Sequence, residues 1–388
     1  MLSLLNKYIM FRNLKKEGTL TIHVLTLVVL PIIVIAFFTT MLWEGQPQNL
    51  PVGVVDLDNS STTRALVRRL DAFQTSEVVG HYSSFSEARE AMQHNEIYGF
   101  IYFPKGTTSD LLASRQPHIS FYYSSASLSA GSLLFRDLKT ITTLGSAAVG
   151  QATLRAKGFT ERQAMAFLQP VTLDVHAIGN PWINYNVYLT TTFAPACIML
   201  FIMLLTAYSI GMMLKHGTGK ESLSRHNGNI WAVLFHRLWP QSLVFNVIML
   251  LFELFVYQYL GFPHQGGMLR VIILGMVLVT SGQCFGLMIF GLIPSLRMSM
   301  SICSLWAVLS FSMVGTAFPA MGMDAPLQAL AWLFPMRHYF MIYSICIFND
   351  YTLIDVWPHM LVLLLFILSP LPLIGRIKTV LSTYEYIE

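Results

Sequence analysis

The stretch KHGTGKESLSRHNGNIWAVLFHR, residues 215–237, separates two long apolar runs of the chain. Four of its residues are cationic and one is acidic: Lys215, Lys220, Arg225, Arg237 and Glu221. Short loops rich in Lys and Arg stay on the cytoplasmic side of a membrane when the protein inserts. We therefore expect this loop to face the cytosol, and the flanking apolar runs to cross the membrane away from it.

The composition supports a membrane protein. Over 388 residues the chain is 54% hydrophobic and 11% charged, with a mean hydropathy of +0.56, whereas a soluble domain carries about 25% charged residues. The net charge of +4 is modest, and the cations collect at the edges of apolar runs instead of forming a basic stripe with interleaved aromatic residues. Cations at the edges of apolar runs indicate which side of the membrane each loop faces. The lack of a basic stripe means that nucleic acid is not expected as a partner.

Apolar runs long enough to cross a bilayer occur six times, since about 20 helical residues span a 30 Å hydrocarbon core. We expect transmembrane helices over residues 20–43, 183–214, 238–260, 271–293, 299–317 and 358–374. The first run is too long for a cleaved signal peptide and is expected to be an uncleaved anchor. The sequence thus predicts a polytopic α-helical membrane protein.

Basic residues near the chain ends and in a short turn complete the topology. Arg297 lies in the turn before the fifth span, and residues 376–388 follow the last span as a cytoplasmic tail. Residues 1–19 combine four cations with apolar residues at helical spacing, which predicts an amphipathic helix in the cytoplasmic headgroup layer. A frayed basic tail that only sets orientation is the alternative.

Between the first two spans, residues 44–182 have the chemistry of a soluble domain, with 11 Lys or Arg and 12 Asp or Glu between Trp43 and Trp182. Strands alternate with helices, which predicts an α/β domain with a mixed or parallel sheet. The strands are expected over residues 52–56, 77–82, 98–103, 118–123 and 171–178, and the helices over 61–73, 86–94, 109–113, 127–157 and 160–168. The topology places this inserted domain outside the cytoplasm.

Residues 318–356 are too interrupted by proline and charge for an ordinary crossing. We expect a re-entrant or interfacial pair of helices on the outer side there. The five-helix part of the membrane domain then spans residues 183–375, with the loop 215–237 on its cytoplasmic side.

The sequence predicts no catalytic, cofactor or metal site on this chain. A phosphate-binding loop needs G-x-x-x-x-G-K-[ST], but here the leading position is Leu214 and Glu221 follows Lys220. The four cysteines lie in or beside apolar segments without paired spacing, so neither a zinc site nor a disulfide framework is indicated. The chain is therefore not expected to hydrolyse ATP by itself.

Glu253 is the one acid well inside a predicted span. A charged side chain at a helix centre in the membrane costs about 2.5–3.5 kcal/mol, so such residues are rare and often functional. One interpretation makes Glu253 an intramembrane polar site on a substrate or proton path. The other makes it a protonated or interfacial side chain that bonds to a neighbouring helix.

Three segments resemble the permeases of the ABC type 2 transporter family, in particular the drug or lipid exporters with a large extracytoplasmic domain after the first span. VVDLDNSSTTRALVRRLDA (54–72) is similar to the start of that domain. GTGKESL (217–223) is similar to the cytoplasmic loop, and FPMRHYFMIYSICIF (334–348) to the proline-then-basic segment before the last span. Together with the order of the six spans, the likeness covers nearly the whole chain.

The resemblance implies a permease subunit of an ATP-driven exporter. A second permease copy and a separate ATP-binding ABC subunit, which would hold ATP and Mg, are its implied partners, together with the lipid bilayer and a periplasmic adaptor protein. The implied location is a bacterial inner membrane. Lys220, Glu221 and Arg225 would contact the ATPase, and spans two and five would line the path of a drug-like, lipid or other substrate.

Two other functions fit the sequence less well. A membrane receptor or assembly factor could sense ligands through the outer domain without transport, and co-purification of an ATPase would separate it from an exporter. An intramembrane enzyme would need close pairs of ionisable residues, which the spans lack.

Overall fold

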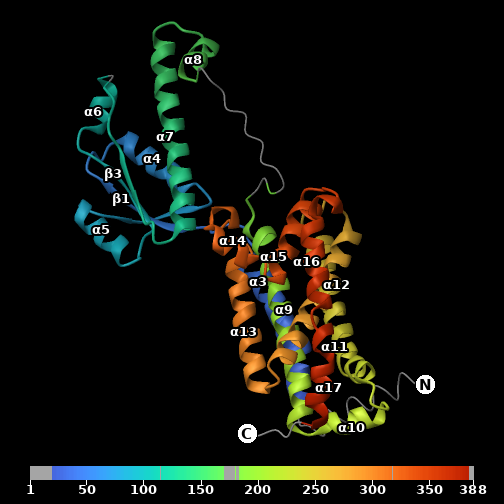
Figure 1. Cartoon of the computed structure of the whole chain (residues 1–388). Helices are drawn as coiled ribbons and strands as arrows, with labels where there is room; N and C mark the ends of the chain where they lie inside the picture. The colour runs from blue at the N-terminus through green and yellow to red at the C-terminus, as the bar shows by residue number, and fades with distance from the viewer. Residues whose placement is uncertain (1–19, 114, 170–179, 181–182, 317, 384–388) are drawn as a thin grey trace. The chain divides into compact units, whose positions relative to one another are not determined.

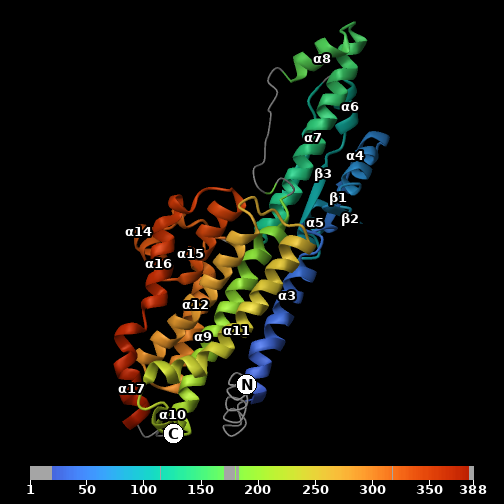
Figure 2. The ribbon, with the colours of Figure 1, turned by 90° about the vertical axis from the view of Figure 1, so that its right-hand side faces the viewer.

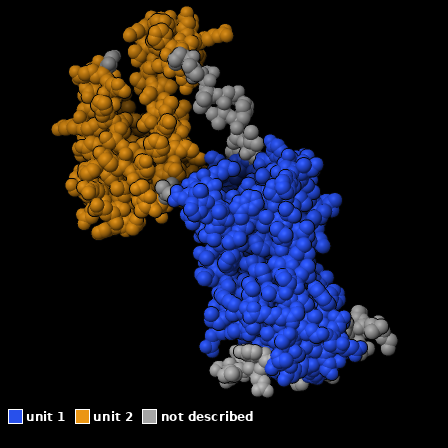
Figure 3. All heavy atoms as spheres, viewed as in Figure 1, with its two compact units in different colours: residues 1–43, 177–388 blue, residues 44–176 orange. Residues whose placement is uncertain are grey.

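The structure is a computed structural model that describes residues 20–113, 115–169, 180, 183–316 and 318–383 (Figures 1 and 2). The chain divides into two compact units, coloured separately in Figure 3. Unit 1 holds residues Met1–Trp43 and Ala177–Glu388, and unit 2 holds Glu44–His176. The helix predicted over residues 1–19 and the strand predicted over 171–178 lie outside the described residues.

Unit 2 is built on a four-stranded mixed sheet with the order β2-β1-β3-β4. β1 (Leu50–Asp56) is parallel to β2 (Ser76–His81) and to β3 (Gly99–Phe103), whereas β4 (Ser120–Tyr123) is antiparallel to β3. The helices are α4 (Ser61–Asp71), α5 (Phe85–Gln93), α6 (Thr107–Leu112), α7 (Leu128–Ala156) and α8 (Glu161–Leu168). Four of the five predicted strands and all five predicted helices are therefore found, with ends that differ by at most two residues.

Helices cover both faces of this sheet. Val52 and Val54 of β1 pack in a core with residues of α4 and α7, whereas Val55 packs with Ala88 and Ala91 of α5. All three valines are fully buried. A strand that is covered on both faces has no solvent side, which explains why VGVVD is a continuous apolar run that lacks polar alternation.

Among the residues that the structure describes, unit 1 contains six helical segments that are long and apolar enough to cross a membrane. They cover Thr21–Met41, Asn186–Lys215, Ile230–Tyr259, Met268–Leu292, Leu296–Met313 and Leu353–Thr383. Their elements are α2 (Leu20–Val24), η1 (Leu25–Val29) and α3 (Leu30–Met41); η2 (Asn186–Thr190) and α9 (Thr191–Lys215); α11 (Ile230–Glu253) and η3 (Leu254–Tyr259); α12 (Met268–Leu292); α13 (Leu296–Met313); and η6 (Leu353–Val356), α16 (Trp357–Leu368), η7 (Leu371–Leu373) and α17 (Ile374–Thr383). The prediction of a polytopic helical membrane protein with six spans agrees with this architecture.

The second span is the central helix of unit 1. In the most apolar stretch of the η2–α9 span 72% of the residues are buried, compared with 22% in the α13 span. α9 packs against α3, α11, α12 and α13, as the two ribbon views show (Figures 1 and 2). Small residues permit this close packing, because a Cβ on Gly286 of α12 would lie 2.8 Å from the backbone oxygen of Met203.

Two boundaries differ from the sequence prediction. α11 begins at Ile230, so residues 230–237 are helical and the loop after α9 is shorter than the predicted 215–237. The polar residues His236 and Arg237, in the first two turns of α11, are the reason that the sequence predicts a loop there. At the other end of the chain, helix continues as α17 to Thr383, through the basic residues that were assigned to the tail.

The predicted helical pair within 318–356 is present as α14 (Ala325–Ala331) and α15 (Pro335–Ile342), with η4 (Ala320–Gly322) before it and η5 (Tyr343–Phe348) continuing α15. α15 is well enclosed, because it packs against α9, α12, α13 and α16. Pro335 occupies its first turn, where proline is tolerated. α15 therefore belongs to the helical core of unit 1, whereas all residues of α14 except Ala331 are exposed.

Candidate functional site

A short amphipathic helix, α10 (Thr218–Arg225), connects the second and third spans. Gly217 precedes it with φ = 65°, a left-handed conformation that glycine adopts without strain. After it, Asn227 and Gly228 also have positive φ, and the Asn229 side chain caps α11 by accepting a hydrogen bond from the Trp231 N–H at 3.0 Å. The glycines and asparagines that looked like a loop thus form the two turns that bound α10.

The apolar side of α10 rests on the C-terminal helix. Leu223 belongs to a compact core that joins α9, α10, α11, α12 and α17. Gly219 lies directly against Leu381 of α17, because an added Cβ would come within 3.1 Å of the Leu381 backbone oxygen. Figures 1 and 2 show α10 and α17 together at one end of unit 1. The sequence assigned α17 to a tail, although Ile374, Ile377 and Leu381 recur at helical spacing.

The charged side of α10 carries the three residues that the sequence selected. Lys220, Glu221 and Arg225 are all exposed. Glu221 and Arg225 form an ion pair at 2.5 Å across one turn of the helix. The structure thus presents these three side chains on one short, seated helix.

A buried polar layer lies behind α10, between the first, second and third spans. Ser209 of α9 is at its centre: its hydroxyl lies 3.0 Å from His23 Nε2 and donates to Gln241 Oε1 at 3.2 Å. Gln241 Nε2 donates to Thr206 Oγ1 at 3.1 Å, and an Arg237 guanidinium N–H donates to the Ser209 carbonyl at 3.1 Å. All five side chains are buried.

Sequence reasoning missed this layer, because it treated Arg237 as a marker of the membrane edge. The available signal was spacing: Thr206 and Ser209 are three residues apart, and Arg237 and Gln241 are four apart. Each pair therefore lies on one face of its helix. Gln283 of α12 extends the layer, since its amide accepts from Ser242 and donates to the Leu238 carbonyl.

Glu253 is buried at the C-terminal end of α11, at the opposite end of that helix from Arg237. Its side chain is 1% exposed, and its Oε1 atom has no hydrogen-bond partner among the described residues. The carboxyl fits against Gly275 of α12, where a Cβ would be 2.1 Å from Oε1. The described neighbouring helices supply no hydrogen bond to Oε1.

A cavity of about 390 Å³ lies beside η2 and η5. Aromatic and apolar side chains form most of its wall, and two asparagines and a serine supply polar groups: Asn180, Ile183, Asn184, Tyr185, Val187, Tyr188, Phe340, Tyr343, Ser344 and Phe348. No charged side chain is among these lining residues. Sequence reasoning could not reveal this cavity, because its wall combines segments more than 150 residues apart.

Metal-binding chemistry has no support within the part of the chain that the structure describes. No group of three or more His, Cys, Asp or Glu side chains is placed to hold an ion there. All four cysteines are free thiols.

Comparison with known proteins identifies the family. The model of the ABC-2 family transporter proteins matches residues 22–373, which include the first candidate span from residue 22, the next four spans, the sixth as far as residue 373, α10 and unit 2. No curated protein matches the chain. Because the match covers far more than half of the sequence, this chain belongs to the ABC-2 family of transporter membrane proteins.

Proposed function

We propose that this chain is the permease subunit of an ATP-driven exporter and that α10 is the surface on which the ATPase acts. Membership of the family supports a multi-pass permease that works with an ABC ATPase subunit, and such membrane components are generally not enzymes by themselves. Export of a drug-like, lipid or other substrate is our inference from the resemblance in sequence. The position of α10 carries the assignment of the coupling surface.

The sidedness follows from charge. α10 with Lys220 and Arg225, and α17 with Arg376 and Lys378, form one end of unit 1 and expose these cations. Cytoplasmic loops carry an excess of Lys and Arg, so we place this end in the cytosol, where ATP is available. Unit 2 follows the first span at its other end, and we therefore place it outside the cytoplasm.

The contacts of α10 offer a way to transmit force. A ligand or partner shifts a conformational equilibrium only through surfaces that it touches. α10 is joined directly to α9 and α11, and the polar layer around Ser209 links the same two helices about two turns from α10. Movement of α10 would therefore be delivered to α9, the central helix.

A second copy would complete the transport path. The resemblance assigns the lining to spans two and five, but α9 is enclosed within unit 1 and packs along α13. The exposed face of α13, with Leu305, Val308 and Leu309, is the part of this pair that a second copy can meet. We propose that this face, backed by α9, borders the path in a dimer.

Charge reversal on α10 tests the coupling surface. The Glu221–Arg225 pair is exposed, so its loss costs α10 only about 0.2–0.5 kcal/mol. We expect Glu221→Lys or Arg225→Glu to abolish substrate-stimulated ATP hydrolysis by the reconstituted complex while the basal rate persists. The double variant Glu221→Arg/Arg225→Glu restores an ion pair within α10 but presents reversed charges to the ATPase, so it should remain uncoupled.

The matched control is the exposed pair Arg115–Asp110 of unit 2, which has a distance of 2.9 Å. Reversing Asp110 to Lys should leave coupling unchanged. Full recovery of coupling in the α10 double variant would show that the pair acts only within the helix, and would remove this surface from the proposal.

A further inference from the structure

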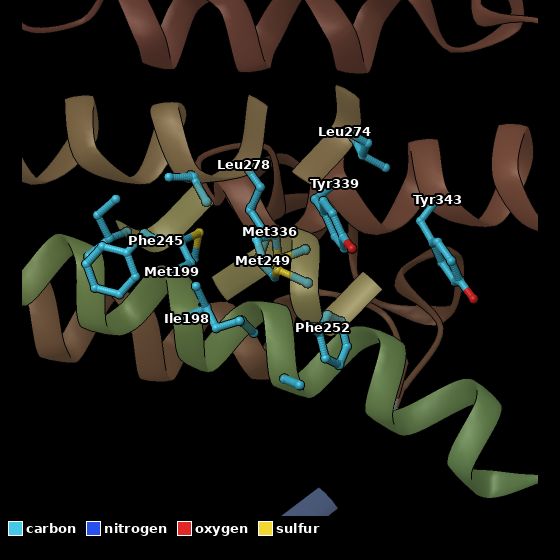
Figure 4. Close-up of a cluster of buried hydrophobic side chains, with 14 of the residues drawn as sticks. Ile198, Met199, Phe245, Met249, Phe252, Leu274, Leu278, Met336, Tyr339 and Tyr343 are labelled. Carbon is cyan, nitrogen blue, oxygen red and sulfur yellow. The ribbon is translucent and has the colours of Figure 1, made fainter. Parts of the chain in front are cut away.

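A carboxyl group buried deep between membrane helices is the starting point. Glu253 is 1% exposed and its Oε1 atom has no hydrogen-bond partner in the described part of the chain. Met249 and Phe252 of its own helix and Leu274 of α12 belong to a large buried apolar cluster, shown in Figure 4. An ionised carboxylate is expensive in such surroundings, so the group is stable there as the neutral acid.

The neighbouring helix is shaped around this carboxyl. An ideal Cβ on Gly275 would be 2.1 Å from Glu253 Oε1 and 3.0 Å from the carboxyl carbon. Any larger residue at this position would displace the acid. The backbone of α12 thus leaves a recess that the carboxyl fills, without giving it the hydrogen bonds that a purely structural polar group normally has.

Tyrosine phenols connect Glu253 to a more open region. Tyr257 of η3 follows Glu253 by four residues in the same span, and Tyr257, Tyr339 of α15 and Tyr343 of η5 belong to the buried cluster that contains Met249 and Phe252. The Tyr343 phenol oxygen is buried and makes no hydrogen bond to a described residue. The rings of Tyr339 and Tyr343 are parallel, with centroids 6.5 Å apart (Figure 4).

Tyr343 also forms part of the wall of the 390 Å³ cavity. A route can therefore be drawn from a space large enough for water to a buried acid. It leads from the cavity to Tyr343, then to Tyr257 and then to Glu253. It passes through two π-helical segments, η3 and η5, and a third, η2, lines the cavity. π-Helical turns are rare and frequently mark functional sites, because they shift side chains out of regular helical register.

We propose that Glu253 is a proton-binding site of the membrane unit, which exchanges its proton with water in the cavity through the phenols of Tyr257 and Tyr343. On release, the Glu253 O–H gives its proton to the Tyr257 oxygen, Tyr257 passes its own proton to Tyr343, and Tyr343 passes its own to a water molecule. Each phenol gains one proton and loses one, so the net products are a carboxylate and a hydronium ion. Uptake is the reverse.

The groups around Glu253 favour exchange through phenols. The titratable side chains that surround Glu253 among the described residues are three tyrosines: Tyr257 of the same span, Tyr339 of α15 and Tyr343 of η5. On the α12 side the carboxyl meets Gly275, which is not titratable. His264 packs on the far side of Tyr257, with ring centroids 5.5 Å apart. Arg270, which lies on α12 as Gly275 does, is engaged with Asp350 at 2.8 Å and with the Cys346 carbonyl. The structure gives Glu253 no ion pair with a described residue.

Infrared difference spectroscopy on the full chain in nanodiscs tests the proposal directly, because a protonated carboxyl has its own C=O stretching band. We expect a band that is present at low pH and lost as the pH rises while the chain stays folded. Glu253→Gln should remove it, and Glu253→Asp should shift its frequency, which identifies the band even if one variant folds poorly.

The route is tested by the rate of exchange after a pH jump. Tyr343→Phe and Tyr257→Phe should keep the band but slow its change about tenfold or more, because a positioned proton donor is removed. Tyr185→Phe, which alters the same cavity away from the route, should exchange at the wild-type rate. A Glu253 band that does not respond to pH, or an unchanged rate in Tyr343→Phe, would overturn the proposal. The measurement needs no ATPase, so its failure would leave the proposed coupling surface standing.

Discussion

Polar side chains buried between apolar helices need partners inside the protein, and the two ends of α11 meet this need differently. Near its start, Gln241 uses both amide atoms, accepting from Ser209 and donating to Thr206. At its end, Oε1 of Glu253 has no bond to a described residue. A satisfied layer specifies one arrangement of helices, whereas an unsatisfied acid is a candidate for chemistry.

Gly275 provides a residue-scale test of how closely the Glu253 carboxyl is packed. Gly275→Ala places a methyl group in the space of Oε1 and should lower the unfolding free energy of the chain in detergent by about 1–3 kcal/mol. In a Glu253→Ala background the space is open, and the penalty should fall by about 1 kcal/mol or more. Gly375→Ala is the matched control, since nothing lies within 4 Å of an added Cβ there. Equal penalties in both backgrounds would contradict this packing.

Asp58 gives a pH-dependent test in unit 2. The hydrogen bond from the Thr108 hydroxyl, with those from Ser60 and from the Thr108 and Gly106 N–H groups, holds the pKa of Asp58 below its ordinary value of 3.8. A lowered folded-state pKa means that the stabilisation is present above the unfolded pKa and is lost as pH falls through the folded pKa. Asp58→Ala should therefore speed amide exchange in residues 104–112 at neutral pH, and this difference should vanish below the folded pKa.

The exposed acid Glu96 is the control for Asp58. Glu96→Ala should leave exchange in residues 104–112 unchanged at every pH. An effect of Asp58→Ala that persists in strong acid would mean that the carboxylate charge does not hold this loop.

At the scale of elements, the seating of α10 on α17 is open to test. Gly219→Val pushes side-chain atoms into Leu381, whose backbone oxygen lies 3.1 Å from an ideal Cβ. A shift of α10 that costs about 1.4 kcal/mol in the coupled state should lower stimulated ATP hydrolysis about tenfold while the six spans stay folded. Leu381→Ala should partly restore it. Ser224→Val, on the exposed side of α10, serves as control, and an equal loss there would refute the seating.

Periodicity and apolar length were sufficient to predict most elements. The strands of unit 2 are recognisable because VGVVD and GFIYF are short apolar runs bounded by turn residues, and the spans because few other helices are so long and apolar. Boundaries failed where polar residues lie inside helices: Arg237 reads as a membrane edge in sequence, yet it is a buried donor to α9.

The candidate sites were less accessible to sequence reasoning. Lys220, Glu221 and Arg225 could be selected by charge, but their common face depends on α10 being a helix seated by Leu223. The recess at Gly275 and the cavity beside Tyr343 arise from contacts between segments far apart in the chain, which one sequence does not report. Glu253 can be selected from the sequence because it is the one acid well inside a predicted span. The tyrosines around it cannot be, because two of them come from segments more than 80 residues away in the chain.

At the scale of the whole molecule, the two compact units differ in what they contain. Unit 1 carries the spans, the proposed coupling helix α10 and the buried acid, whereas unit 2 is an α/β unit inserted between the first two spans. Because an ATPase in the cytosol can act only on cytosolic surfaces, the proposed coupling requires α10 to be accessible from the cytosol and unit 2 to be inaccessible from it.

Site-specific cross-linking to the ATPase is the most direct measurement of this central claim. In a background without the four native cysteines, we predict that Lys220→Cys forms a cross-link to the ATPase subunit in intact membranes. Lys105→Cys, at an exposed position of unit 2, should form none. A cross-link from position 105 together with none from position 220 would contradict the account.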